Sequence, residues 1–257
     1  MERQNQQLVS QKPWSELTEE EQQIIRESWK YALPEEYDVY CIGDFTWERI
    51  LKIPGNLYVK GNIKCKDDIS ADGDIIVENS IDGIDIKSGA TIFVGSDIDS
   101  FNITAGEDFV VGGHLNCFDV EVKGDFIANN AVDCTRLTAC GNCSVATNMN
   151  SGEINVDGNL DIGEGLFASN VNVGGNFSVQ GNVNCASVNV QGDITIGQKI
   201  ESLDVATSGN FTVGTVADCT DVTVRGNFVV GKRTDCFRIL VKGEFIVKGL
   251  KISKPGD

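Results

Sequence analysis

The amino-acid sequence predicts an all-β fold, a single-stranded parallel β-solenoid, on three observations. A glycine followed by a polar residue recurs every 17 residues from Gly124 to Gly243. Within each repeat, apolar and polar residues alternate over two short segments with no helical period, which indicates strands with one buried face. A repeat of fixed length that carries short strands is typical of a solenoid, in which each repeat stacks on the next. We therefore expect about 11–12 coils between Gly55 and the C-terminus.

The repeat is clearest over residues 175–191, which read GNFSVQGNVNCASVNVQ. Its first strand has apolar residues at the third and fifth places, Phe177 and Val179. Its second strand has them at the fourteenth and sixteenth places, Val188 and Val190. Because each strand of a solenoid pairs with the same strand of the next coil, identical places should stack about 4.8 Å apart.

Most of the cysteines occupy one place of the repeat, the eleventh, where other repeats have a small residue such as Ser151, Ala168 or Ser202. This pattern predicts an inward-facing ladder in which the thiols act as small hydrophobes. Nine cysteines without the spacing of a small secreted scaffold favour a reducing compartment, so we expect a cytoplasmic protein. The cysteines at or next to this place are Cys65, Cys117, Cys134, Cys185, Cys219 and Cys236.

The recurring glycines are expected to form corners. A Gly-Asn or Gly-Asp pair tolerates positive φ, which a tight corner often needs. The asparagines that follow the glycines should stack their side-chain amides, and calcium binding is disfavoured because the repeat lacks a GGxGxD pattern. This expected ladder includes Asn142, Asn159, Asn176, Asn210 and Asn227.

Residues with catalytic or metal-binding potential do not form a recognisable pattern. His114 is the only histidine, so a catalytic triad or a histidine-rich metal site would lack its other members. Cys140 and Cys143 match C-x-x-C, but they occupy an outward and an inward place of the repeat, and such sulfurs do not share a metal. Carboxylates are so abundant that no pair stands out for glycosidase-like chemistry. We therefore expect no catalytic activity, no cofactor and no bound metal.

Residues 1–54 are expected to form a tail, a helix and a capping segment, ahead of a solenoid domain at residues 55–257. Thr18 and Glu21 form a capping box at the start of the helix, and Pro34 ends it. The simpler interpretation is that this α-helical cap and the segment Tyr37 to Ile53 cover the first coil. The alternative is partner binding by the tryptophans of this region. No stretch is apolar enough for a signal peptide or a membrane span. The tryptophans are Trp14, Trp29 and Trp47.

The net charge changes along the chain. It is −2 over residues 1–66, −20 over residues 67–224 and +5 over residues 225–257. The acidic part, or shaft, would repel a phosphate backbone, so nucleic acid is not expected along its length. The basic end is expected either to receive an acidic surface or to keep an exposed strand edge from unwanted pairing. Its cations are Arg225, Lys232, Arg233, Arg238, Lys242, Lys248, Lys251 and Lys254.

The run GDITIGQKIESLDVATSGNFTVGTVADCTDVTVRGNFVVG resembles the bactofilins and related polymer-forming bacterial proteins. About four fifths of the chain shares this resemblance. It implies a triangular right-handed β-helix and end-to-end assembly without a nucleotide. This chain has about twice as many coils as those proteins, and a helical segment precedes them. The hexapeptide acyltransferases fit less well, because their six-residue repeat and catalytic histidine have no counterpart here.

Two functional hypotheses follow from these features. In the first, the chain is a non-catalytic structural or scaffold protein that forms a homo-oligomer through its last coil, which no helix follows. In the second, it is an acidic binding module or inhibitor that engages a basic protein partner by its shaft or its N-terminal helix. The residues expected to mediate self-association in the first hypothesis are Phe245, Val247, Leu250 and Ile252.

Overall fold

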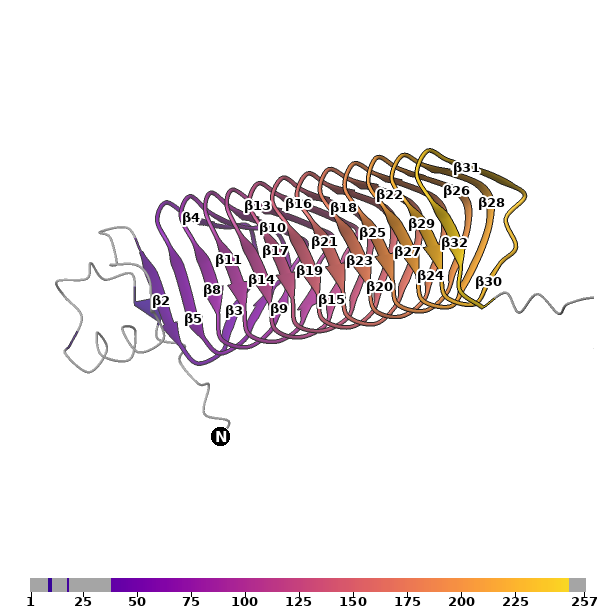
Figure 1. The fold of residues 1–257 in the computed structure, drawn as a ribbon. Helices are drawn as coiled ribbons and strands as arrows, with labels where there is room; N and C mark the ends of the chain where they lie inside the picture. Colours follow the sequence, from indigo (N-terminus) through magenta and orange to yellow (C-terminus); the bar gives the residue numbers. More distant parts are fainter. Residues whose placement is uncertain (1–8, 11–17, 19–37, 250–257) are drawn as a thin grey trace, which may run out of the picture. The chain divides into compact units, whose positions relative to one another are not determined.

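A computed structural model describes residues 9–10, 18 and 38–249 of the chain (Figure 1). Over these residues the fold is an all-β parallel solenoid of about 12 coils with a period of about 17 residues, so the predicted fold class is confirmed there. The described residues contain no helix that is long and apolar enough to cross a membrane. The predicted N-terminal helix, with Trp14 and Trp29, lies outside the described residues.

The chain divides into two compact units, Met1–Cys134 and Thr135–Asp257, with the strand β18 (Val132–Ala139) spanning the division. In the first unit, one sheet has the strand order β1-β2-β5-β8-β11-β14-β17. Those strands are β1 (Val9–Ser10), β2 (Val39–Ile42), β5 (Leu57–Lys60), β8 (Ile75–Val77), β11 (Ile92–Val94), β14 (Phe109–Val111) and β17 (Phe126–Ala128). The other walls of its coils contain β3 (Phe45–Trp47), β4 (Leu51–Ile53), β6 (Ile63–Cys65), β7 (Ile69–Ala71), β9 (Ile81–Asp82), β10 (Asp85–Ser88), β12 (Ile98–Asp99), β13 (Asn102–Ala105), β15 (Leu115–Asn116) and β16 (Asp119–Val122).

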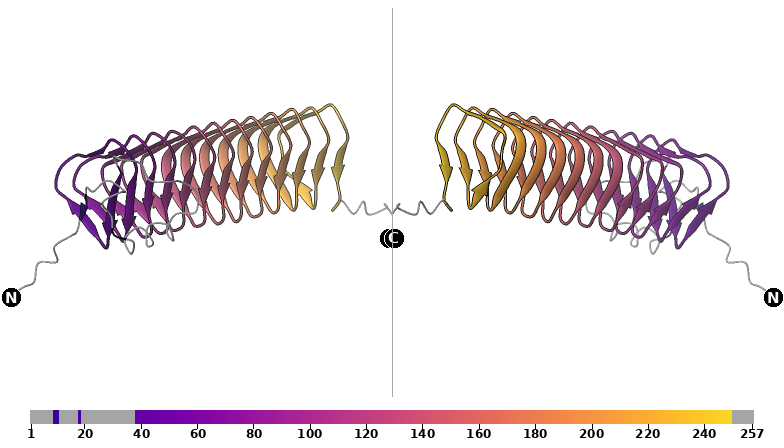
Figure 2. Two further views of the ribbon diagram at one scale, coloured as in Figure 1. Left: turned by 90° about the vertical axis from the view of Figure 1, so that its left-hand side faces the viewer. Right: turned by 90° about the vertical axis from the view of Figure 1, so that its right-hand side faces the viewer.

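The second unit follows the same plan, but single strands of eight or nine residues replace pairs of short strands on its other walls. Figure 2 shows the stacked coils in two further views. The short strands pair in the order β19 (Cys143–Val145), β21 (Leu160–Ile162), β23 (Phe177–Val179), β25 (Ile194–Ile196), β27 (Phe211–Val213), β29 (Phe228–Val230) and β32 (Phe245–Val247). The remaining walls contain β20 (Met149–Val156), β22 (Leu166–Val173), β24 (Val183–Val190), β26 (Ile200–Thr207), β28 (Val216–Val224), β30 (Arg233–Thr234) and β31 (Arg238–Val241).

The strands pair in the register that the repeat predicts. Phe211 of β27 lies opposite Phe228 of β29, and Val188 of β24 lies opposite Val205 of β26, in each case 17 residues apart. The third, fifth, fourteenth and sixteenth places face inward and are almost fully buried in the inner coils. The core of each unit is therefore a set of ladders of like side chains.

The polar residues at the corners form a hydrogen-bonded ladder of their own. The expected link between side-chain amides joins Asn159 Nδ2 to Asn142 Oδ1 at 3.1 Å, but the link that recurs joins a side chain to the backbone. The Asn159 side-chain oxygen Oδ1 accepts the backbone N–H of Asn176 at 2.8 Å, and Asn176 Oδ1 accepts that of Asp193 at 2.9 Å. The same contact continues to Asn227, whose Oδ1 accepts the N–H of Glu244 at 2.8 Å. Each link joins a side chain to the backbone of the following coil, so this ladder fixes the register at the corners.

The recurring glycines serve a different purpose from the one that the sequence suggested. Among the described residues, only Gly43 has a positive φ, of 101°. At the corner glycines an added Cβ would instead meet the preceding coil. At Gly175 it would lie 2.7 Å from the carbonyl oxygen of Gly158. The same holds at a second corner, the sixth place of the repeat, where a Cβ at Gly214 would lie 1.9 Å from the carbonyl oxygen of Gly197. Close stacking of the corners, and not the sign of φ, is what requires glycine.

The solenoid begins one coil earlier than the sequence indicated. The strands β2, β3 and β4 pair in parallel with β5, β6 and β7, so residues 39–53 form a coil and not a cap over one. Tyr37 stands where later repeats have the anchoring glycine. The strand β1 covers the edge of β2, with Val9 paired antiparallel to Cys41.

Candidate functional site at the last described coil

The last described coil, formed by β30, β31 and β32, has an open side. The strand β32 pairs with β29 through Phe228 and Phe245, and no other strand of residues 38–249 pairs with it. The N–H of Phe228 donates to the carbonyl of Glu244 on the next coil at 2.8 Å. By the same register, the N–H of Phe245 points away from β29. The edge of β32 therefore offers backbone donors and acceptors that can pair with another strand.

The hydrophobic core is also exposed at this coil. Phe211, Phe228 and Phe245 stack in one inward-facing ladder, with ring centroids 4.7 Å and 5.1 Å apart. Phe211 and Phe228 are fully buried, whereas 45% of Phe245 is exposed. Val247, which lies at the fifth place, is half-buried, whereas Val230 at the same place one coil earlier is buried. We call the open edge of β32, with Phe245 and Val247, the terminal surface.

The terminal surface contains two of the four residues that the sequence assigned to self-association. Leu250 and Ile252 lie outside the described residues, as do Lys251 and Lys254. The other cations of the basic end are exposed, and two of them are in ion pairs: Arg233 with Asp235 at 2.6 Å, and Arg238 with Asp221 at 2.8 Å. The cations that are exposed here are Arg225, Lys232, Arg233, Arg238, Lys242 and Lys248.

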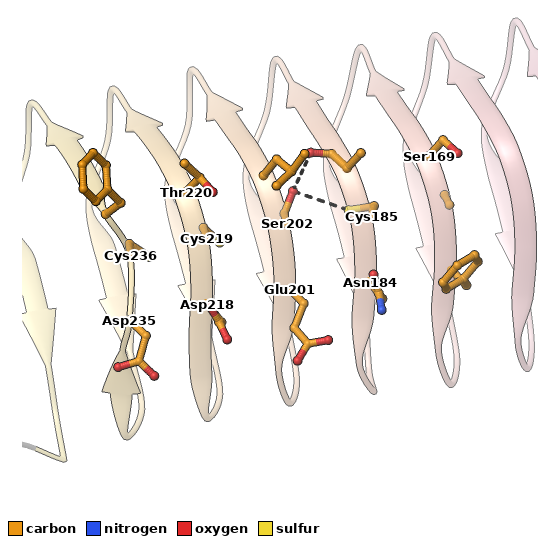
Figure 3. A pocket seen from close by; sticks show the side chains of 15 residues that line it. Ser169, Asn184, Cys185, Glu201, Ser202, Asp218, Cys219, Thr220, Asp235 and Cys236 are labelled. Carbon is orange, nitrogen blue, oxygen red and sulfur yellow. Dashed lines mark hydrogen bonds between the residues drawn. The ribbon is translucent and has the colours of Figure 1, made fainter.

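A groove of about 750 Å³ runs across five coils of the second unit up to the last described coil (Figure 3). Its middle row is the eleventh place of the repeat, with Cys185, Ser202, Cys219 and Cys236. The tenth place forms one side and includes the acidic residues, and the twelfth place forms the other side. The residues of the two sides are Phe167, Asn184, Glu201, Asp218 and Asp235 on one, and Ser169, Ala186, Leu203, Thr220 and Phe237 on the other.

Sequence reasoning missed this groove because it treated the eleventh place only as part of the core. Cys185 and Cys219 are indeed buried, with 5% and 4% of their surface exposed, but Cys236 is half-buried. The row of thiols therefore becomes more accessible toward the last described coil. The available signal was that Cys236 belongs to the last full repeat of the sequence.

The environments of these thiols differ. Burial raises the pKa of the Cys185 thiol to about 11. At Cys219, a hydrogen bond to Cys236 and burial both raise the thiol pKa. The opposite holds at Cys236, where hydrogen bonds from the Cys219 thiol and the Thr234 hydroxyl lower the thiol pKa and outweigh the effect of burial, which raises it. The Thr234 Oγ1 lies 3.2 Å from the Cys236 Sγ.

Cys185 is expected to react slowly with iodoacetamide in the folded protein, because its thiol is buried and mostly protonated at neutral pH. Cys219 should behave in the same way. The exposed Cys140 is the control for accessibility. The measurement is mass spectrometry of peptides after timed labelling. Labelling of Cys185 and Cys219 as fast as that of Cys140 would contradict the inward register of the eleventh place.

The other candidate residues do not join a site. His114 Nε2 lies 2.8 Å from Asp133 Oδ2 on the surface of the first unit. Cys143 is buried and Cys140 is exposed, so they face opposite sides of the wall, as expected. No group of three or more histidine, cysteine or carboxylate side chains among the described residues is placed to hold a metal ion. Trp47 is 40% exposed, and its indole N–H donates to the carbonyl of Ile50 at 3.3 Å.

The chain matches no protein-family model, and no curated protein or solved structure matches it significantly. The resemblance to the bactofilins is therefore supported only at the level of a β-solenoid fold.

Proposed function

We propose that this protein is a non-catalytic structural protein that self-associates through the terminal surface. The observation that carries the proposal is the exposure of Phe245, at 45%, in a ladder whose neighbouring members are fully buried. A second chain that stacked on this coil would bury Phe245 and Val247 and would pair the open edge of β32. Unpaired strand edges and exposed core residues are the features through which sheets extend.

The balance of forces makes this association dependent on salt. Full burial of a phenylalanine or valine side chain contributes roughly 1.5–3 kcal/mol. Phe245 and Val247 are already partly buried in the single chain, so association would add only part of this free energy. Against it stands the net charge of +5 over residues 225–257, which two copies would bring together at a symmetric contact. Salt screens this repulsion, with a Debye length of about 8 Å at physiological ionic strength. We therefore expect association to strengthen as salt is added.

The substitution Val247→Pro is expected to abolish this association. The N–H of Lys248 donates to the carbonyl of Val230 at 2.9 Å, so the alternation along a parallel strand directs the N–H of Val247 to the open side. Proline at this place removes an outward donor and leaves the donors to β29 in place. The control is Val247→Thr, which keeps both the shape and the N–H. Sedimentation velocity at low and physiological ionic strength measures the outcome.

Removal of residues 1–37 tests whether the other end limits assembly. The strand β1 pairs with β2, so its removal opens the edge of the first coil. We expect the truncated protein to form longer polymers than the intact chain. If both proteins are monomeric at every salt concentration, the structural proposal fails.

The acidic binding module is the second candidate, and the register of the carboxylates favours it. Asp204 lies opposite Asp221, and Glu201 lies opposite Asp218, so like charges stack on neighbouring strands, an arrangement that is destabilising. Lys199 contacts Glu201 and Asp218, and Arg238 contacts Asp221, so cations of the chain offset part of this repulsion. A basic protein would relieve the part that remains along the shaft. Light scattering distinguishes the two candidates. The particle mass of a self-associating structural protein rises with its own concentration. The particle mass of a binding module stays that of a single chain until a basic polymer such as polylysine is added.

A further inference from the structure

Two thiols of the groove lie in register on neighbouring coils. The last coil pairs with β28 both before and after the two cysteines, with Ala217 opposite Thr234 and Asp221 opposite Arg238. Cys219 and Cys236 therefore occupy equivalent places one coil apart. Neighbouring strands lie about 4.7–4.9 Å apart, which is within the Cα separation of roughly 4.4–6.8 Å that a disulfide spans.

The surroundings of the pair distinguish the two sulfurs. Cys236 is half-buried and lines the groove, whereas Cys219 is 4% exposed. The Cys236 sulfur receives a hydrogen bond from Thr234, which favours its thiolate, and the protonated thiol donates to the carbonyl of Ala217 at 3.6 Å. Of the charged groups beside it, Asp218 opposes the thiolate, while Asp235 is paired with Arg233.

We propose that Cys219 and Cys236 form an oxidisable dithiol, in which Cys236 is the thiol that reacts with a peroxide and Cys219 is the resolving thiol. The groove gives a small oxidant access to Cys236, and the register places Cys219 next to the product. Because Cys236 belongs to the last described coil, oxidation would join this coil covalently to the one before it. The dithiol does not depend on self-association, so its test is independent of the proposed function.

The reaction balances with hydrogen peroxide as the oxidant. The Cys236 thiolate attacks one peroxide oxygen, the O–O bond breaks, and a sulfenic acid and hydroxide form. Cys219 then attacks the Cys236 sulfur, and the S–O bond breaks as the S–S bond forms. The proton that the Cys236 thiol released on ionising neutralises the first hydroxide ion, and the proton of the Cys219 thiol neutralises the second. Two thiols lose two electrons in total, and one peroxide is reduced to two waters.

The first experiment treats the full, folded chain with hydrogen peroxide and identifies the products by peptide mass spectrometry. We expect a Cys219–Cys236 disulfide in the intact chain and in the control variant Cys140→Ser. In Cys219→Ser, dimedone should trap a sulfenic acid at Cys236. In Cys236→Ser, Cys219 should stay reduced. The absence of the disulfide from the folded protein, or oxidation of Cys219 without Cys236, would overturn the proposal.

A second measurement tests whether the disulfide forms because Cys236 is a reactive thiolate or only because the two thiols are close together. Cys117 and Cys134 are also one coil apart, since Asn116 pairs with Asp133, but burial raises the pKa of the Cys117 thiol. We expect the Cys219–Cys236 disulfide to form faster than a Cys117–Cys134 disulfide. Alkylation of Cys236 should be half-maximal at a lower pH than the roughly 8.5 of an ordinary thiol. Equal rates for the two pairs, or a midpoint near that of an ordinary thiol, would remove the role assigned to Cys236.

Discussion

Replacing Phe228 with alanine is expected to lower the free energy of unfolding by about 3–5 kcal/mol. Phe228 is fully buried, and its ring stacks on Phe211 at 4.7 Å and on Phe245 at 5.1 Å. The coils on each side are held in register by the strand pairs of β29, so they cannot collapse into the space that the ring leaves. The loss therefore includes both the burial of the ring and the cavity. Urea denaturation followed by circular dichroism measures it.

The matched control for this prediction is Phe237→Ala. Phe237 is nine residues further along the chain, and 90% of it is exposed, so the same change of side chain should alter stability by less than about 0.5 kcal/mol. If Phe228→Ala costs less than about 1 kcal/mol, the third place of the repeat does not carry the core, and the ladder is not what holds these coils together.

Gly214→Ala is expected to have the second largest effect, a destabilisation at or above the upper end of the roughly 1–3 kcal/mol that overpacking costs. The added Cβ would lie 1.9 Å from the Gly197 carbonyl oxygen and 2.8 Å from its carbon. Both are backbone atoms next to the paired strands β25 and β27, so relief requires the two coils to separate. The measurement is the same denaturation experiment.

Gly165→Ala is the control for the effect of alanine itself. Its Cβ would meet the Asn148 side-chain oxygen at 3.0 Å and a backbone oxygen, that of Asn182, only at 3.6 Å. A side-chain amide can shift by a few tenths of an ångström, so we expect a change within about 1 kcal/mol. Equal stability of the two variants would show that close stacking is not the reason for glycine at these corners.

The sequence predicted the inner coils well because each place of the repeat has the same environment in every coil. Phe211 and Phe228 are interchangeable in this sense, so a spacing of 17 residues is sufficient to predict both their burial and their partners. The ends of the solenoid break this equivalence. The spacing of glycines did not predict the first coil because Tyr37 stands in the sequence where a glycine is expected.

The candidate site was predictable in part. Phe245 and Val247 were placed at the open edge of the last coil from the repeat alone, and the structure leaves both partly exposed. The groove was not predictable, because its sides are the tenth and twelfth places, where the residue type varies from Phe167 to Asp235.

The corner ladder gives the molecule a polarity. In both units its links run the same way along the sequence, from the Asp38 side chain to the N–H of Asn56 and from the Asn227 side chain to the N–H of Glu244. One face of any coil thus presents side-chain acceptors and the opposite face presents backbone donors. Two chains that met by their acceptor faces would place acceptor against acceptor and would stop at a pair. Only a chain added in the same orientation continues the ladder. A polymer that extends the ladder therefore has a direction, and its two ends are chemically distinct.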